Sequence, residues 1–169
     1  SRLMCALEVL RKRGKDLRGN PISLGNTRFS IGMWIGGGSS AEVYAARSLA
    51  ARQPCAIKIL RDDWIHDVQS VALMRREAGV GLRVRHPHLV TFFDAHVFCP
   101  PYFLVMELLE GESVRDRLRR EYALEVAAAL WIVRQTAEAL VALHNAGFVH
   151  GDVKPENIRL ADEGRAVLV

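Results

Sequence analysis

The chain has 169 residues, of which 50% are hydrophobic and 25% charged, and its formal net charge is +4. This composition is typical of a soluble folded protein, and basic clusters without interleaved aromatic residues do not favour a nucleic-acid-binding function. The three cysteines, Cys5, Cys55 and Cys99, have no metal-ligand spacing and indicate no disulfide framework, so reduced thiols in the cytoplasm are expected.

The first part of the chain is expected to be a leader followed by a strand-rich region. Residues 1–27 are basic and interrupted by glycines and Asn20-Pro21, which predicts a leader or linker with a short helix near residues 4–10. Strands are predicted over 28–35, 42–47 and 55–60, and again over 89–97 and 102–107, on either side of Pro100-Pro101. Between them, apolar residues at helical spacing predict a helix over 63–83.

After Gly111 the pattern becomes helical. A short helix capped by Ser113 is predicted over 113–120, and a long helix ended by Gly147 over 124–145. The apolar face expected for the long helix is made by Leu124, Ala128, Trp131, Leu140 and Leu143. Residues 149–169 are expected to form a loop and two short strands. Residues 126–133 are among the longest apolar runs and are too short to cross a bilayer, so no membrane segment is predicted in this chain.

Three consecutive glycines, Gly36, Gly37 and Gly38, separate the first two predicted strands of the 28–47 region. Glycines between strands usually form only a turn. The alternative is a phosphate-binding loop, because backbone N–H groups at Gly36 and Gly38 can approach anionic oxygens closely without side chains. Val43, on the next strand, would then point into an apolar ligand site.

Lys58 and Glu77 suggest a site only when they are taken together. Lys58 ends the apolar run Ala56-Ile57-Lys58 and could by itself be a strand-end lysine reaching water. Glu77 lies on the following predicted helix and could be a surface charge. As a pair, the carboxylate could hold the ammonium group in place to bind phosphate.

The segment 150–157, His-Gly-Asp-Val-Lys-Pro-Glu-Asn, carries the strongest signal. Phosphoryl transfer needs a carboxylate that receives a hydroxyl proton, a cation near the moving phosphoryl group and oxygen ligands for Mg²⁺. Asp152, Lys154 and Asn157 offer these three groups within one loop. The structural alternative is a polar turn in which Asp and Asn bind backbone groups.

In order and spacing, these segments resemble the protein kinase family in its bacterial-type serine/threonine form, over residues 28–169. Residues 35–43 resemble the glycine-rich loop, Ala56-Ile57-Lys58 the strand with the phosphate-anchoring lysine, and residues 150–157 the catalytic loop. Residues 85–90 resemble the stretch between the helix that carries Glu77 and the next strand, and residues 104–107, followed by Gly111, resemble the end of the last strand and the hinge. The Lys-Pro-Glu-Asn form indicates Ser/Thr rather than Tyr acceptors.

The resemblance implies an α+β, two-lobe fold. Its first lobe, residues 28–107, would hold a five-stranded antiparallel sheet with one main helix. Residues 108–169 would form the hinge and the beginning of a helical second lobe, ending before the Asp-Phe-Gly motif. The chain would then be the ATP-binding portion of a kinase that phosphorylates protein Ser/Thr hydroxyls, and it is expected to be inactive on its own.

The resemblance also implies the site residues, with ATP and Mg²⁺ as cofactors and a protein as the phosphate acceptor. Asp152 and Lys154 would be catalytic, and Asn157 would bind Mg²⁺, with a second ligand beyond Val169. Met106 would be the gatekeeper and residues 107–109 the adenine-binding hinge. The ATP-binding residues would be Ile35, Gly36, Gly37, Gly38, Ser39, Val43, Ala56, Lys58, Glu77, Met106, Glu107 and Leu109.

Three residues depart from the family pattern. Ala41 replaces the third loop glycine, Gly151 stands where many members have arginine, and Arg159 stands where an apolar residue usually lies under the adenine. Two other functions remain as alternatives. One is a small-molecule phosphotransferase of the kinase-like superfamily, in which a His-Gly-Asp loop is common. The other is a non-catalytic nucleotide-binding or scaffold protein.

Overall fold

The computed structural model describes residues 21–24, 27–161 and 164–169, so the expected helix near residues 4–10 lies outside the described residues. The chain divides into two units, the first reaching to Gly79 and including Phe92–Leu108, the second containing Val80–Thr91 and Leu109–Val169. The predicted first lobe, residues 28–107, differs from this division at residues 80–91. This segment joins the second unit because Leu89 forms a parallel bridge with Leu168, and Val90 N–H donates to the Leu168 carbonyl at 3.0 Å.

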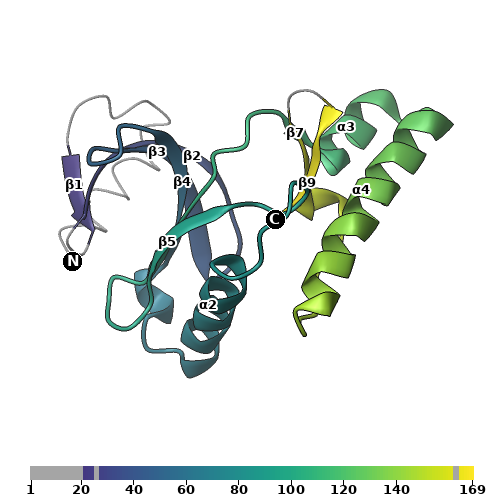
Figure 1. The fold of residues 1–169 in the computed structure, drawn as a ribbon. Helices are drawn as coiled ribbons and strands as arrows, with labels where there is room; N and C mark the ends of the chain where they lie inside the picture. The colour runs from purple at the N-terminus through teal and green to yellow at the C-terminus, as the bar shows by residue number, and fades with distance from the viewer. Residues whose placement is uncertain (1–20, 25–26, 162–163) are drawn as a thin grey trace. The chain divides into compact units, whose positions relative to one another are not determined.

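In the described part of the first unit, six antiparallel strands form one sheet in the order β1-β2-β3-β4-β6-β5 (Figure 1). The strands are β1 Pro21–Leu24, β2 Thr27–Gly37, β3 Ala41–Ser48, β4 Pro54–Leu60, β5 Phe92–His96 and β6 Phe103–Met106. The five predicted strands are confirmed, and β1 adds a sixth. It pairs with β2 from Pro21↔Ser30 to Leu24↔Thr27 and thereby satisfies backbone groups that β2 would otherwise leave unpaired.

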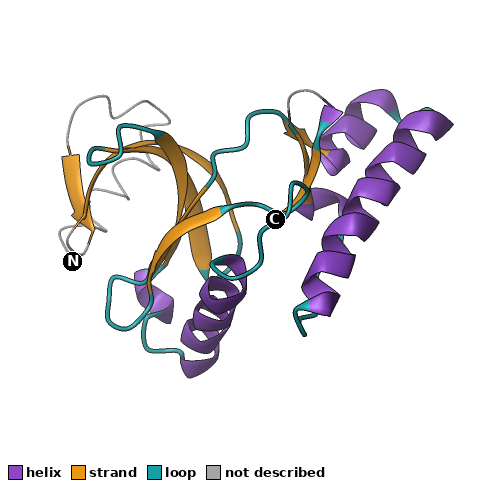
Figure 2. Ribbon diagram, in the orientation of Figure 1, coloured by secondary structure: helices purple, strands orange, loops and turns teal. Residues whose placement is uncertain are grey.

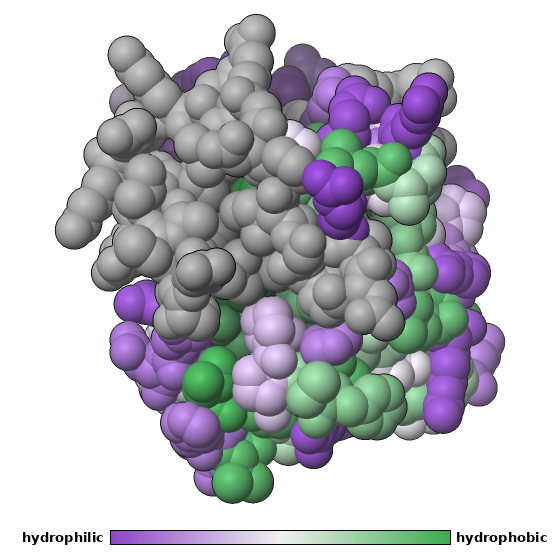
Figure 3. All heavy atoms as spheres, turned by 90° about the vertical axis from the view of Figure 1, so that its left-hand side faces the viewer, coloured by the Kyte–Doolittle hydropathy of each residue, from purple (hydrophilic) through white to green (hydrophobic). Residues whose placement is uncertain are grey.

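The core of the first unit follows from alternation along the strands. Every second side chain on β3 from Glu42 onward is buried, and most side chains on the more central strand β4 are buried. The aromatic rings of Phe29 and Phe103 meet edge to face with centroids 6.3 Å apart. The buried cluster consists of Phe29, Ile31, Tyr44, Ala46, Cys55, Ile57, Ile59, Phe103 and Val105. Seen from the β1 side, the described surface mixes polar and apolar residues (Figure 3), as expected when the apolar set faces inward.

The main helix of the first half of the chain, α2, spans Val68–Gly81 and is shorter than the predicted 63–83. A separate 3-10 turn, η1, occupies Asp62–Trp64. Asp67 sets the start of α2, because its Oδ2 accepts from Ser70 N–H at 2.7 Å and its carbonyl from Val71 N–H at 3.1 Å. A helix continuing from residue 63 would lose this cap.

Among its described residues, the second unit contains a small antiparallel sheet and two α-helices (Figure 2). The elements are β7 Glu112–Ser113, α3 Val114–Glu121, α4 Val126–Asn145, the 3-10 turn η2 Pro155–Asn157, β8 Ile158–Leu160 and β9 Ala166–Leu168. The two helices and the two terminal strands are confirmed. The pattern missed β7, because two residues cannot show an alternation. The Ser113 cap is confirmed, since its Oγ accepts from Asp116 N–H at 3.1 Å.

Helix α4 packs on β9, and the expected face is confirmed in part, because Leu143 is buried and Leu124 and Leu140 pack against the same core, whereas Ala128 and Trp131 are exposed. Its buried residues are Ile132, Gln135, Thr136, Ala139 and Leu143, whereas Trp131 is 53% exposed. Gln135 explains the difference: its Oε1 accepts from Ala166 N–H at 2.7 Å, so a polar residue lies at the centre of the buried face. The predicted stop is confirmed, because Gly147 has φ +80° and Phe148 N–H donates to the Leu143 carbonyl.

By length and composition alone, α4 could also cross a membrane. Its most apolar 18-residue window has a mean hydropathy of 1.5 and is 22% buried, and core helices of soluble proteins pass the same test. The apolar stretch extends beyond residues 126–133 because Arg134 and Glu138 are the only Asp, Glu, Lys or Arg residues of α4, and mostly apolar residues follow them. These two charged residues form an ion pair with an N–O distance of 2.9 Å.

Candidate active site

The glycine-rich segment joins β2 to β3 through a turn closed by Gly38 N–H, which donates to the Ala41 carbonyl at 2.9 Å. A Cβ atom at Gly37 would lie 2.8 Å from that same carbonyl oxygen, so the turn requires glycine there. At Gly36 and Gly38 a Cβ atom would meet nothing within 4 Å. These two glycines therefore leave open space beside the backbone, with Ile35 and Ser39 exposed next to them.

Lys58 and Glu77, which lie 19 positions apart, are brought together by the packing of α2 on the sheet. The Lys58 ammonium donates to both carboxylate oxygens of Glu77, at 2.8 and 2.7 Å. The two side chains are 29% and 37% exposed. A half-buried ammonium group held by two bonds keeps one position and still has a donor left for an anionic ligand.

Most of the residues predicted to lie near the adenine of ATP belong to three neighbouring strands of the first unit, β3, β4 and β6. Ala56 on β4 is paired with Met106, the last residue of β6, and both side chains are buried. Val43 on β3 is paired with Lys58 and is partly exposed. Glu107 and Leu109 follow in the connector and are partly exposed as well.

In the second unit, the loop before β8 gathers the three polar side chains that the sequence singled out. The Lys154 ammonium donates to the Asp152 carboxylate oxygens at 2.9 and 2.7 Å. The Asn157 amide nitrogen donates to Oδ2 and to the carbonyl of Asp152, both at 2.8 Å. Asn157 is placed by the short turn η2, where its N–H donates to the Lys154 carbonyl at 2.9 Å.

These bonds determine the charge of Asp152. They hold the pKa of its carboxyl below the ordinary value of 3.8, chiefly because Lys154 donates to it, then because Asn157 does. The side chain is 61% exposed, so the carboxylate is ionised at neutral pH and open to a hydroxyl donor. In a simple polar turn, Asp and Asn would bind backbone groups. Here both Lys154 and Asn157 donate to the exposed carboxylate of Asp152, in addition to the bond from Asn157 to the Asp152 carbonyl.

The residues around Asp152 include one that the sequence did not assign a role. His150 Nδ1 accepts from Asp152 N–H at 3.3 Å, which leaves Nε2 as the protonated nitrogen, 3.2 Å from the Val169 carbonyl. The imidazole thus ties the loop to the residue after β9. Gly151, between them, has φ +79°, a left-handed conformation that favours glycine over other residues.

Asn157 is the residue here that could hold a metal ion. Since its amide nitrogen is bonded to Asp152, its amide oxygen points the other way and is the end that suits Mg²⁺. Among the described residues there is no group of three or more His, Cys, Asp or Glu side chains that could hold a metal ion. Within this loop, the Asn157 amide oxygen is thus the donor to which a Mg²⁺ ion could bind.

Arg159 and Glu156 are bonded to parts of the second unit that spacing in the sequence could not indicate. Arg159 Nη2 donates to the Gly111 carbonyl, and Arg115 Nη1 forms an ion pair with the Glu156 carboxylate. Both contacts join the loop and β8 to residues more than 40 positions earlier. Of these residues, only Arg159 is unusual in the sequence, because a charged residue stands between two apolar ones, Ile158 and Leu160.

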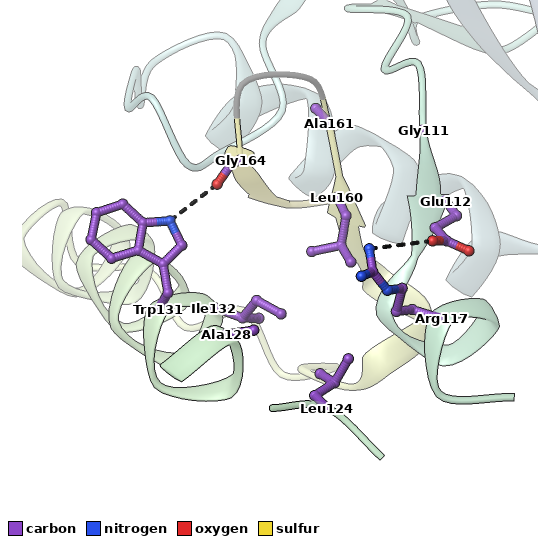
Figure 4. Close-up of a pocket in the computed structure, with 10 residues that line it drawn as sticks. All are labelled: Gly111, Glu112, Arg117, Leu124, Ala128, Trp131, Ile132, Leu160, Ala161 and Gly164. Atoms are coloured by element: carbon purple, nitrogen blue, oxygen red, sulfur yellow. Dashed lines mark hydrogen bonds and ion pairs between the residues drawn. The ribbon is translucent and has the colours of Figure 1, made fainter. Parts of the chain in front are cut away.

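A separate cavity of about 570 Å³ lies within the second unit (Figure 4). Leu124, Ile132 and Leu160 line it with apolar side chains, and Arg117 and Glu112 stand at one side. Trp131 borders it, with its indole N–H donating to the Gly164 carbonyl at 3.1 Å. None of the site residues predicted from the sequence lines this cavity.

Comparison with known proteins places this arrangement in context. A family model described as the protein kinase domain matches residues 29–168. The chain is 38% identical over 138 residues to the serine/threonine-protein kinase PkaB of Streptomyces coelicolor, covering 82% of this chain and 33% of PkaB. It is 34% identical over 137 residues to the serine/threonine-protein kinase PrkC of Bacillus subtilis, covering 81% and 21%. The chain thus spans a third or less of these two relatives.

A solved structure is similar as well. The kinase domain of Mycobacterium tuberculosis PknI matches with a TM-score of 0.75 and 25% identity, covering 87% of this chain and 60% of that one. The similarity therefore extends over both units of the described chain.

Proposed function

The chain belongs to the protein kinase family, and from this premise we propose that it is the ATP-binding portion of a protein that transfers the γ-phosphoryl group of ATP to a Ser or Thr hydroxyl of a protein. The observation that carries the proposal is the convergence of Lys154 and Asn157 on the ionised carboxylate of Asp152. Relatives named serine/threonine-protein kinases support the acceptor class.

In this proposal most of the nucleotide-binding residues belong to the first unit, and Leu109 belongs to the second. The open backbone at Gly36 and Gly38 receives phosphate oxygens, and Lys58, held by Glu77, binds the α and β phosphates. Val43 and Ala56 cover the adenine, Met106 is the gatekeeper, and the backbone of residues 107–109 bonds the adenine edge. The remaining nucleotide-binding residues, Ile35, Gly37 and Ser39, belong to the glycine-rich turn.

In the second unit, Asp152 accepts a hydrogen bond from the acceptor hydroxyl and takes its proton as the hydroxyl oxygen bonds to phosphorus. Lys154 places a positive charge beside that carboxylate, where negative charge accumulates on the moving phosphoryl group. Catalysis then rests on positioning and charge compensation, because no covalent bond to the protein forms. Mg²⁺, when bound at the Asn157 amide oxygen, would neutralise phosphate charge.

The net charge is only +4, and the basic clusters in the sequence are not interleaved with aromatic residues. The proposed partners are therefore ATP and a protein substrate, without a nucleic acid. The odd number of cysteines, with Cys55 and Cys99 both free, supports a reducing compartment, and we place the protein in the cytoplasm. Helix α4 is assigned to the core of the second unit rather than to a membrane, since Leu143 and Ala139 are buried against the sheet.

The proposal is tested in two steps. Titration of this chain with ATP and MgCl₂ by calorimetry is expected to show binding that weakens about tenfold or more in Lys58→Met, because a charge-assisted contact to phosphate is lost. In the full-length protein, labelled γ-phosphate is expected on a protein acceptor such as casein and not on a panel of sugars and amino alcohols.

The outcomes separate the alternatives. Transfer to a small molecule but not to protein would replace the proposal with the small-molecule phosphotransferase. Binding of ATP without transfer to any acceptor by the full-length protein would indicate the non-catalytic function.

A further inference from the structure

A thiol and an imidazole are paired on the hairpin between β5 and β6, in residues to which the proposed phosphotransfer gives no role. Cys99 is exposed, and its Sγ lies 3.7 Å from Nε2 of His96. Cys99 and the neighbouring Phe98, which is 87% exposed, both lie on the surface of the hairpin.

His96 is held in one tautomer and one orientation. Its Nδ1 lies 2.9 Å from the Pro101 carbonyl oxygen, which can only accept, so Nδ1 carries the hydrogen and Nε2 keeps its lone pair. The imidazole stacks on the ring of Phe103, with centroids 5.1 Å apart and an interplanar angle of 9°. Phe103 belongs to the buried core, which fixes the plane of the imidazole. Nε2 is therefore a proton acceptor directed at the thiol.

This arrangement has the parts of an activated nucleophile: a thiol, a base at hydrogen-bond distance and a third group that orients the base. Arg75 Nε donates to the Val97 carbonyl at 2.8 Å, which helps to hold the backbone of the same hairpin in place. Cys55 offers the contrast, because it is fully buried and burial raises the pKa of its thiol.

We propose that Cys99 is a covalent modification site that reacts with low-molecular-weight disulfides, with His96 as its general base. His96 Nε2 takes the proton from Cys99 Sγ, and the sulfur attacks one sulfur of the disulfide R–S–S–R. The S–S bond of the disulfide breaks, and the leaving thiolate takes the proton from the imidazolium. The products are the mixed disulfide Cys99–S–S–R and the thiol R–SH, so the Cys99 sulfur is oxidised and the leaving sulfur is reduced.

The experiment measures the rate at which oxidised glutathione modifies Cys99 at pH 7, followed by mass spectrometry of the intact chain and its peptides. All proteins carry Cys5→Ser, which leaves Cys55 and Cys99 as the thiols. His96→Asn keeps an N–H donor for Pro101 and His96→Phe keeps a ring to stack on Phe103, but both lack Nε2. Both are expected to slow the adduct at Cys99 at least about tenfold, the low end of general-base effects.

His66→Asn is the matched control, because His66 is an exposed histidine of the same unit and its replacement should leave the rate unchanged. Unreacted Cys55 in each variant shows that the unit is still folded. Modification of Cys99 at the wild-type rate in both His96 variants would overturn the role of His96. Equal rates for Cys99 and a Cys-containing tripeptide would overturn the site itself.

Discussion

At the scale of single residues, the charge of Asp152 decides what it can do. The bonds from Lys154 and Asn157 lower its pKa, which keeps the carboxylate ionised and also makes it a weak base. A weak base cannot remove a proton from a free alcohol, whose own acidity is far lower. In the proposed function, Asp152 would therefore first orient the hydroxyl and accept the proton only as bonding to phosphorus makes the hydroxyl acidic.

Replacing Asp152 by Asn tests this role. The amide keeps the size of the side chain but removes the charge and the proton acceptor. In the full-length protein, phosphotransfer is expected to fall about 100-fold or more, whereas ATP affinity changes less than about threefold. The measurements are initial rates with labelled ATP and calorimetric titration. Asp63→Asn, at an 82% exposed position on η1, is the control. A rate within threefold of wild type would remove Asp152 from the chemistry.

At the scale of elements, short local bonds decide where helices and turns begin. Ser113 and Asp116 cap α3 reciprocally, with Ser113 Oγ–H donating to Asp116 Oδ2 at 2.6 Å and Asp116 N–H donating back at 3.1 Å. Asp67 caps α2 in a similar way. The glycine-rich turn is governed by one close backbone approach, at Gly37.

Ser113→Ala is expected to lower the free energy of unfolding by about 1 kcal/mol at pH 7, as for other lost N-caps. The Ser113 hydroxyl lowers the pKa of Asp116 below 3.8 in the folded chain. A lowered pKa stabilises the fold fully above the unfolded value and loses this effect as pH falls through the folded value. Urea unfolding as a function of pH should therefore show the difference between wild type and variant shrinking below pH 3.8. A constant difference would exclude the contribution of Asp116.

Gly37→Ala and Gly38→Ala form a matched pair within the turn. The added methyl group at Gly37 would lie 2.8 Å from the Ala41 carbonyl oxygen and is expected to destabilise the first unit by about 1–3 kcal/mol. At Gly38 it meets nothing within 4 Å, so stability should stay within about 0.5 kcal/mol. Thermal unfolding by circular dichroism measures both. Equal destabilisation by the two variants would contradict the assignment of the turn.

At the scale of the whole molecule, the chain contains two units with separate cores. The first core is centred on Tyr44 and Ile57 in the large sheet. The second contains Leu168 and Leu143, between the small sheet and α4. Segment 80–91 belongs to the second unit through backbone pairing with Leu168 of β9, although it begins in the last turn of α2.

Leu168→Ala tests this division. Leu168 is 1% exposed, and its truncation is expected to cost about 2–5 kcal/mol. Hydrogen exchange should speed up in segments 80–91 and 109–169 and stay nearly unchanged in β2, β3 and β4. Val169→Ala, at a 39% exposed neighbour, is the control. Faster exchange spread evenly over the described residues would show one cooperative core instead.

The sequence predicted most elements of the fold because hydrophobic periodicity and punctuation act locally. Five strands of the first unit, α3, α4 and the caps at Ser113 and Gly147 follow from that information. It failed at β1 and β7, which exist only because a neighbouring strand offers backbone partners. It placed Leu143 on the buried face of α4 correctly but put Trp131 there instead of Gln135, because the Ala166 N–H that Gln135 accepts from lies 31 positions away in the sequence.

The candidate site divides in the same way. The sequence by itself determined which residue types were available, because Asp152, Lys154 and Asn157 lie within six positions and can meet in one loop. Only the tertiary structure decided that Lys58 meets Glu77, that Arg159 turns to the Gly111 carbonyl and that His96 faces Cys99 with its basic nitrogen. The physical reason is that local order depends on neighbouring residues, whereas the first two contacts depend on how segments 19 and 48 positions apart are packed. The third contact is local in sequence, but its geometry depends on the bond from His96 to Pro101 and on the stacking of His96 on Phe103.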